Sequence, residues 1–180
     1  MADITVVALV GSLRAASINR QLAELAAQSA PDGVEVIVFE GLGDLPFYNE
    51  DIDTADAPAA VTALRAAAGA ADAALVVTPE YNGSIPGVLK NAIDWLSRPW
   101  GDGALKEKPL AVIGTALGRY GGAWAHDEAR KSFGIAGARV VESISLSLPA
   151  ATLDGKHPRE DADVAAAVRE AIGKLAAEVR

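Results

Sequence analysis

The segment ITVVALVGSLRAASINR, residues 4–20, carries the clearest signal for the fold. Residues 4–10 are apolar at nearly every position and rich in β-branched side chains, and the run ends at Gly11. Such a run is typical of a strand that is buried on both faces of a sheet. Apolar residues then recur at helical spacing from Ile18, and Pro31 lies beyond the end of this pattern. A buried strand that leads directly into a helix indicates a parallel sheet covered by helices.

The same alternation of strand and helix repeats along the chain. Further strands are predicted at residues 34–39, 73–78, 110–115 and 140–148. Further helices are predicted at residues 57–70, 85–97 and 120–135, and a last one carries an apolar stripe from Val164 to Val179. This pattern predicts an α/β fold, a flavodoxin-like three-layer α/β/α sandwich with a five-stranded parallel sheet in the order 2-1-3-4-5. Residues 1–180 are expected to form it as a single domain.

The fifth predicted strand differs from the others. Residues 143–148 alternate between serine and apolar side chains, whereas the other strands are apolar almost throughout. Alternation with a period of two indicates one wet face, so this strand is expected at an edge of the sheet.

The composition excludes several chemistries. The 180 residues contain no cysteine, which rules out disulfide frameworks, thiolate metal sites and cysteine nucleophiles. Any electron transfer must therefore use a bound cofactor. The net charge of −8 argues against a nucleic-acid partner. No window of about 18 apolar residues and no targeting signal is present, so no membrane partner and a cytoplasmic location are expected.

The loop that follows the first strand has the composition of a phosphate site. In such sheets, ligands bind beyond the carboxyl ends of the strands at the point where the strand order reverses. Residues 11–20 place a tight turn and short or charged donors at a helix N-terminus: Ser12, Arg14, Ser17 and Asn19. The alternative is an ordinary polar loop with Ser17 as the helix N-cap. Neither the G-x-G-x-x-G nor the Walker pattern is present.

The loop after the third strand is stiff and rich in turn residues. Pro79, Asn82, Gly83 and Pro86 restrict the backbone, so its N–H and C=O groups suit the hydrogen-bonding edge of a heterocycle. Tyr81 has the amphipathic character needed to pack on a ring. The alternative is a tight turn that leads into a buried helix.

The loop after the fourth strand, residues 115–124, is rich in glycine. Gly118 and Gly122 allow a ligand to approach the backbone closely, and Thr115, Arg119 and Tyr120 add donors and a ring. The alternative is a flexible glycine turn. The three loops together are stronger evidence for a ligand site than any one of them alone.

These residues resemble the NADPH-dependent FMN reductase family, which includes quinone, azo-dye and chromate reductases. Residues 11–19 match its pattern GS-x-R-x-x-S-x-N, and residues 79–95 match PEYN followed by S-x-P-G-x-LKNA-x-DW without a gap. Residues 44–51 are similar to the family's loop near a neighbouring subunit. The resemblance extends from about Ile4 to about Leu148.

The resemblance implies bound FMN, NADPH or NADH as the hydride donor, and a homodimer or homotetramer. Hydride would pass from NAD(P)H to FMN, and two electrons then to a small-molecule acceptor: a quinone, a flavin, an azo compound or a metal oxyanion. No catalytic side chain and no metal are expected. The implied cofactor-binding residues are Ser12, Arg14, Ser17, Ile18, Asn19, Pro79, Glu80, Tyr81, Asn82, Gly83, Ser84, Thr115, Gly118 and Gly122.

Two questions stay open at this point. A flavodoxin-like electron carrier that does not itself oxidise NAD(P)H is the alternative function, although the first loop lacks the T/S-x-T-G-x-T pattern of flavodoxins. Among single residues, His126 is interpreted as a solvated surface histidine, with a proton donor to a quinone as the alternative. Glu80 is interpreted as structural, with a general base as the alternative, and Arg119 as a contact to the NADPH phosphate. Trp95 is assigned either to the core or to a subunit interface.

Overall fold

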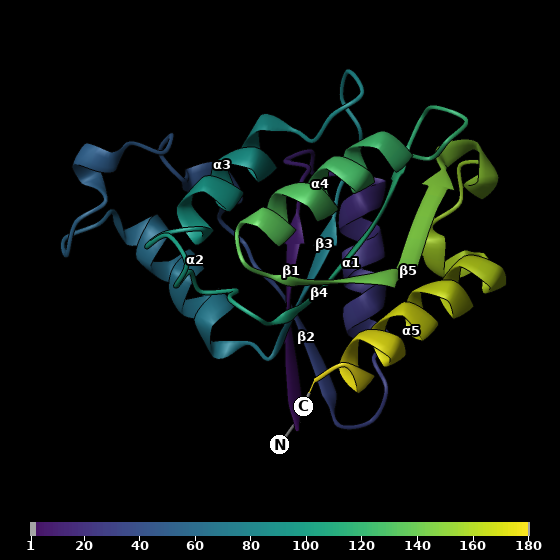
Figure 1. Cartoon of the computed structure of the whole chain (residues 1–180). Coiled ribbons are helices and arrows are strands. Elements are labelled where there is room, and N and C mark those ends of the chain that lie inside the picture. Colours follow the sequence, from purple (N-terminus) through teal and green to yellow (C-terminus); the bar gives the residue numbers. More distant parts are fainter. Residues whose placement is uncertain (1–2, 180) are drawn as a thin grey trace.

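Five parallel strands form the central layer of the computed structural model, which describes residues 3–179 (Figure 1). The strands are β1 (Ile4–Val10), β2 (Val34–Val38), β3 (Ala73–Val77), β4 (Pro109–Ala116) and β5 (Arg139–Pro149). Their order is β2-β1-β3-β4-β5, which confirms the prediction. The order reverses between β1 and β3, which pair from Val6↔Ala73 to Val10↔Val77, so their carboxyl ends lie side by side.

Helices cover both faces of this sheet (Figure 1). They are α1 (Ile18–Gln28), α2 (Ala59–Ala70), α3 (Gly87–Leu96), α4 (Ala123–Ile135) and α5 (Ala162–Ala177). Alternate residues of β1 point to opposite faces, so Val6 and Ala8 pack with α1 and α5, whereas Val7 and Leu9 pack with α2, α3 and α4. The two hydrophobic cores give the three predicted layers. Four short 3₁₀ helices lie in the connections: Leu42–Asp44, Glu50–Ile52, Ala150–Leu153 and Pro158–Glu160.

Helices α2, α3 and α4 begin two or three residues later than predicted. Pro58 and Pro86 adopt extended N-cap conformations, so the first helical residues are Ala59 and Gly87. Gly122 has φ +94° and delays the start of α4 to Ala123. Periodicity marks which residues face the core but does not reveal where the backbone turns into the helix.

Strand β5 lies at the edge of the sheet, as predicted. Ile144 and Leu148 are buried, whereas Ser143 and Ser145 are exposed. The pairing of β5 with β4 shifts register between Leu110 and Val112, so an irregular segment interrupts the ladder. The edge position explains the alternating sequence, because only one face of β5 packs on the core.

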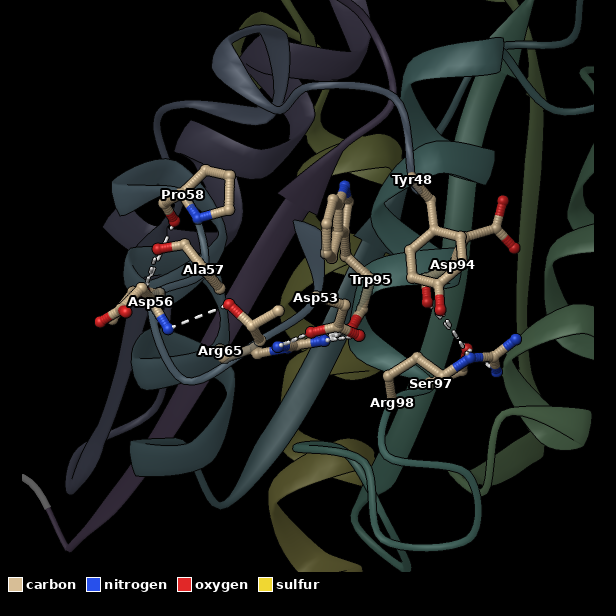
Figure 2. Close-up of polar contacts among 12 residues, drawn as sticks. Tyr48, Asp53, Asp56, Ala57, Pro58, Arg65, Asp94, Trp95, Ser97 and Arg98 are labelled. Atoms are coloured by element: carbon tan, nitrogen blue, oxygen red, sulfur yellow. Dashed lines mark hydrogen bonds and ion pairs between the residues drawn. The ribbon is translucent and has the colours of Figure 1, made fainter. Parts of the chain in front are cut away.

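The long connection after β2 is attached to α3 by buried polar contacts. Asn91 donates from Nδ2 to the Pro46 carbonyl at 2.9 Å, and the Trp95 indole N–H donates to the same oxygen at 2.8 Å. Trp95 is fully buried and packs edge-on against Tyr48, as Figure 2 shows. Trp95 therefore belongs to the core of the protein, which decides between the two alternatives that the sequence left open.

Candidate functional site

The loops after β1, β3 and β4 meet at the carboxyl ends of the strands and enclose a cavity of about 230 Å³. Most of the predicted cofactor-binding residues line it: Ser12, Arg14, Ser17, Ile18, Asn19, Pro79, Glu80, Tyr81, Thr115 and Gly118. Ala116, Leu117 and Ala150 also line the cavity but were not singled out from the sequence. Ala150 comes from the loop after β5, which reaches the site because β5 pairs with β4.

The first loop presents free donors at the start of α1. Ser17 is the N-cap, as the alternative interpretation of this loop proposed, and its Oγ accepts from the Arg20 N–H at 3.4 Å. Within residues 3–179, no acceptor is recorded for the N–H groups of Ile18 and Asn19. Among residues 3–179, the hydrogen bond of the exposed Arg14 guanidinium is to the Ala16 carbonyl, at 3.4 Å. Free N–H groups, a helix dipole and a cation favour an anion here.

Gly11 allows this loop to lie close to the end of β3. A Cβ atom at Gly11 would come within 2.5 Å of the Thr78 hydroxyl oxygen, so no larger residue fits without a shift. The Gly11 N–H also donates to the Val77 carbonyl at 2.9 Å. The close approach brings the first and second loops together around the cavity.

Asn19 connects the first loop to the third. Its Oδ1 accepts from the Thr115 N–H at 2.9 Å, and its Nδ2 donates to the Thr115 carbonyl at 3.0 Å. The Asn19 side chain is therefore engaged by the backbone, and only its main-chain N–H is left to face a ligand. The Thr115 hydroxyl oxygen is buried at the cavity and has no hydrogen-bond partner among the described residues. A buried hydroxyl without a partner marks a place where a ligand can supply the missing bond.

The second loop is a rigid two-residue hairpin. Tyr81 and Ser84 exchange two backbone hydrogen bonds, of 3.0 and 3.1 Å. Asn82 and Gly83 between them both have positive φ, 53° and 75°, as a type I′ turn requires. The stiffness expected from the sequence is present. However, Asn82, Gly83 and Ser84 form the exposed tip and are not among the residues that line the cavity.

Glu80 attaches the second loop to α4. Its Oε2 accepts from the Ala125 N–H, in the first turn of α4, at 3.2 Å. A carboxylate at this position satisfies one of the free N–H groups of the helix and interacts favourably with its dipole. This contact is the structural role that the sequence analysis expected for Glu80.

His126 is fully buried, so its interpretation as a solvated surface residue was wrong. Its Nε2 lies 3.0 Å from the Thr78 carbonyl and its Nδ1 lies 2.7 Å from the Ser147 hydroxyl. A carbonyl only accepts, so we assign the proton to Nε2, and Nδ1 accepts from Ser147. Burial lowers the pKa of His126, which is therefore neutral at pH 7. His126 connects the ends of β3 and β5 beneath the cavity.

The glycines of the third loop have different roles. Gly118 lines the cavity and has open space around its Cα atom. Gly122 is the N-cap of α4 in a left-handed conformation, and a Cβ atom there would lie 3.2 Å from the His126 Nε2. Gly122 thus starts a helix over His126 and does not line the cavity.

A larger and more open hollow of about 540 Å³ is lined by a different set of residues, which includes Tyr48, Arg98 and Trp100. Arg65 pairs with Asp53 through two hydrogen bonds, of 2.7 and 3.0 Å, and holds the pKa of that carboxyl below its usual range. No group of acidic or histidine residues with metal-ligand geometry is found among residues 3–179. The smaller cavity carries the unsatisfied donors, and we take it as the functional site.

A doubly wound sheet with an anion cradle at the β1–α1 turn and a cavity where the strand order reverses defines a flavodoxin-like, cofactor-binding protein. The chain belongs to the NADPH-dependent FMN reductase family, which it matches over residues 4–153. The chain is an NAD(P)H-dependent FMN oxidoreductase, with FMN and NAD(P)H as its cofactors. The family assignment favours this activity over that of a carrier that does not oxidise NAD(P)H.

Curated relatives and solved structures agree with this assignment. The chain is 46% identical over 127 residues to a 2-hydroxy-1,4-benzoquinone reductase of a Burkholderia species, covering 71% of this chain and 68% of the relative. It is 44% identical over 128 residues to a quinone reductase of Pseudomonas putida, and the match covers 71% of this chain and 68% of that relative. The structure of FerB, a flavoenzyme NAD(P)H:(acceptor) oxidoreductase from Paracoccus denitrificans, superposes with a TM-score of 0.85 at 35% identity and covers 98% and 97% of the two chains.

A flavodoxin from Pseudomonas aeruginosa superposes with a TM-score of 0.58 at 23% identity over 98% and 99% of the chains, which shows the fold alone. No helix among residues 3–179 combines the length and hydrophobicity needed to span a membrane.

Proposed function

We propose that the cavity binds FMN with its phosphate at the start of α1 and its ring beside residues 79–81, and that a quinone receives the electrons. The observation that carries this proposal is the set of donors left free around the cavity: the Ile18 and Asn19 N–H groups, the Arg14 guanidinium and the Thr115 hydroxyl. They fit a cofactor that has a phosphate at one end and polar groups along its length. When bound, FMN accepts a hydride and passes on two electrons.

Local charge is what allows an anion to bind to this acidic chain. The net charge of −8 repels a phosphate at long range, so the binding energy must come from contacts within a few ångströms. The N-terminal dipole of a helix contributes about 0.3–1 kcal/mol at exposed sites, and Arg14 adds charge-assisted hydrogen bonds. Arg14 is therefore the residue whose loss weakens phosphate binding most.

The protein's own residues act by positioning. The Tyr81–Ser84 hairpin, the Asn19–Thr115 contacts and the His126–Thr78 hydrogen bond hold the three loops in one arrangement. A fixed arrangement matters because transfer between two rings depends on their distance and alignment. No side chain is needed as an acid or base, and neutral, buried His126 serves to hold the Thr78 carbonyl.

A quinone is the acceptor class that the relatives favour, since several are named quinone reductases. The sequence resemblance leaves flavins, azo compounds and metal oxyanions as further acceptors, and these compete in the same assay. We also propose that the whole chain acts as one flavodoxin-like unit in the cytoplasm and assembles as a homodimer or homotetramer. Exposed apolar side chains support assembly, notably Phe47, which is 86% exposed, and Trp100, which is 68% exposed.

The visible spectrum of the purified protein tests the reaction. We expect a yellow protein that bleaches when NADPH is added without oxygen and regains its colour when a benzoquinone follows. A protein that binds FMN but is not bleached by NADPH or NADH contradicts the proposal.

Arg14→Ala tests the placement of the phosphate. Loss of a charge-assisted contact is expected to raise the dissociation constant for FMN about tenfold or more, measured by flavin fluorescence after dialysis. Arg169→Ala is the matched control, because Arg169 is an exposed arginine on α5. Equal FMN retention in both variants rules out a phosphate at Arg14.

A further inference from the structure

Two exposed aromatic residues, Tyr120 and Trp124, follow Leu117 and Gly118, which line the cavity. Tyr120 is 50% exposed and Trp124 is 60% exposed. Their ring centroids lie 5.8 Å apart with planes inclined by 41°. The Trp124 ring also lies against the hairpin of the second loop, since a Cβ atom at Gly83 would be 3.7 Å from it. The pair thus forms a continuous aromatic surface next to the hairpin.

Arg119 lies directly on this surface. Its guanidinium stacks over the Tyr120 ring at 4.5 Å from the centroid and donates to the Tyr120 hydroxyl oxygen. No carboxylate lies within 4.0 Å of it among residues 3–179, whereas Arg20, Arg65 and Arg139 all form ion pairs. Stacking holds the guanidinium plane and leaves its remaining N–H donors free to bind an anion.

The surface continues from the proposed cofactor site. Leu117 and Gly118 line the cavity, and Arg119 and Tyr120 follow them in the chain. A ligand whose one end enters the cavity mouth therefore has its other end within reach of an aromatic surface with an unneutralised arginine. The ligand chemistry that fits is a planar heterocycle with a phosphate close to it.

We propose that Arg119, Tyr120 and Trp124 bind the adenosine 2′-phosphate part of NADPH, with the purine on the aromatic surface and the phosphate on Arg119. This inference rests on the proposed function, because it assumes that the nicotinamide end enters the same cavity. NADPH differs from NADH only by the 2′-phosphate, so a contact to this group makes the enzyme prefer NADPH. Arg119 is then the residue that determines nucleotide specificity.

Steady-state kinetics of Arg119→Gln test the inference. Loss of a charge-assisted phosphate contact is expected to raise the KM for NADPH about tenfold or more and to leave the KM for NADH, kcat and FMN retention unchanged. Arg98→Gln is the matched control, because Arg98 also stacks on aromatic rings, Tyr48 and Trp100, but beside the separate, larger hollow. An equal change for both nucleotides, or no change for NADPH, overturns the inference.

A binding experiment separates this inference from the proposed function. Calorimetric titration of the FMN-loaded protein with adenosine 2′,5′-bisphosphate is expected to give a dissociation constant at least about tenfold lower than titration with adenosine 5′-monophosphate. Arg119→Gln is expected to remove the difference, and Trp124→Ala to weaken both. Equal affinity for the two nucleotides in the wild-type protein overturns the inference. Tight bisphosphate binding by a protein that oxidises neither NADPH nor NADH supports the site and overturns the proposed function.

Discussion

Acidification is expected to destabilise the folded protein through His126. The neutral ring bridges the Thr78 carbonyl and the Ser147 hydroxyl in a fully buried position. Burial is the main cause of its lowered pKa, and the nearby Arg130 lowers it further. The Thr78 hydrogen bond and the carboxylates of Glu80 and Asp127 act in the opposite direction but do not outweigh burial. The folded protein therefore resists protonation of this ring.

The direction of the pH effect on stability depends on whether the folded or the unfolded state binds the proton more readily. The unfolded chain protonates His126 near the ordinary pKa of 6.5, whereas the folded protein does so only at lower pH. The contribution of His126 to the free energy of unfolding is fully present above this value. It is lost as the pH falls towards the pKa of folded His126, by up to about 1.4 kcal/mol per pH unit. For a chain of this size, a loss of about 1.4 kcal/mol lowers Tm by roughly 3–6 °C.

Urea unfolding of the FMN-free protein between pH 7.5 and pH 5 measures this effect. Carboxylates with lowered pKa, such as Glu40 and Asp53, titrate below their ordinary values of 4.5 and 3.8 and stay outside this range. We expect His126→Gln to be less stable at pH 7.5 and to lose the steep dependence on pH. His157→Gln, at the half-buried N-cap of a 3₁₀ helix, is expected to keep it. The same slope in His126→Gln and the wild type refutes the reasoning.

Two further predictions concern stability. Asn19→Ala removes two hydrogen bonds and leaves the Thr115 N–H and carbonyl without partners, so the free energy of unfolding is expected to fall by about 2–4 kcal/mol in urea titrations. The exposed Gln28→Ala on α1 is the control, and a loss below about 0.5 kcal/mol for Asn19→Ala contradicts the assigned contacts. In Gly83→Val the Cβ atom meets the Trp124 ring only at an ordinary contact distance of 3.7 Å, but a β-branched residue is forced to φ +75°, for an expected cost of about 1–2 kcal/mol in the same assay. Gly87→Ala is its control, and equal stability of the two variants speaks against strain at the hairpin tip.

Much of the fold was predictable because its signals are local. The apolar runs of β1 and β3, the helical stripes and the serine alternation of β5 each depend on neighbours in sequence. The arrangement of the first loop, residues 11–20, was predictable for the same reason. A strand, a short loop of donors and a helix N-terminus are consecutive in the chain, and Ser17 caps the helix where the sequence placed it.

The residues that local patterns left misassigned or undecided depend on contacts across the fold. His126 looks like a polar residue near a helix start, and only the packing of α4 over the ends of β3 and β5 buries it. Trp95 likewise finds its partner in the Pro46 carbonyl, far away in the chain. Ala150 reaches the cavity because β5 pairs with β4.

Local sequence patterns were enough to predict the alternation of strands and helices, their order in the sheet, and the three loops that enclose the cavity. Periodicity and short motifs carry that information because they act between residues a few positions apart. How the loops are held together depends on contacts between residues far apart in the chain, those of Asn19 with Thr115 and of the buried His126 with Thr78. Such contacts join residues that approach each other only when the chain folds, so no local sequence pattern predicts them.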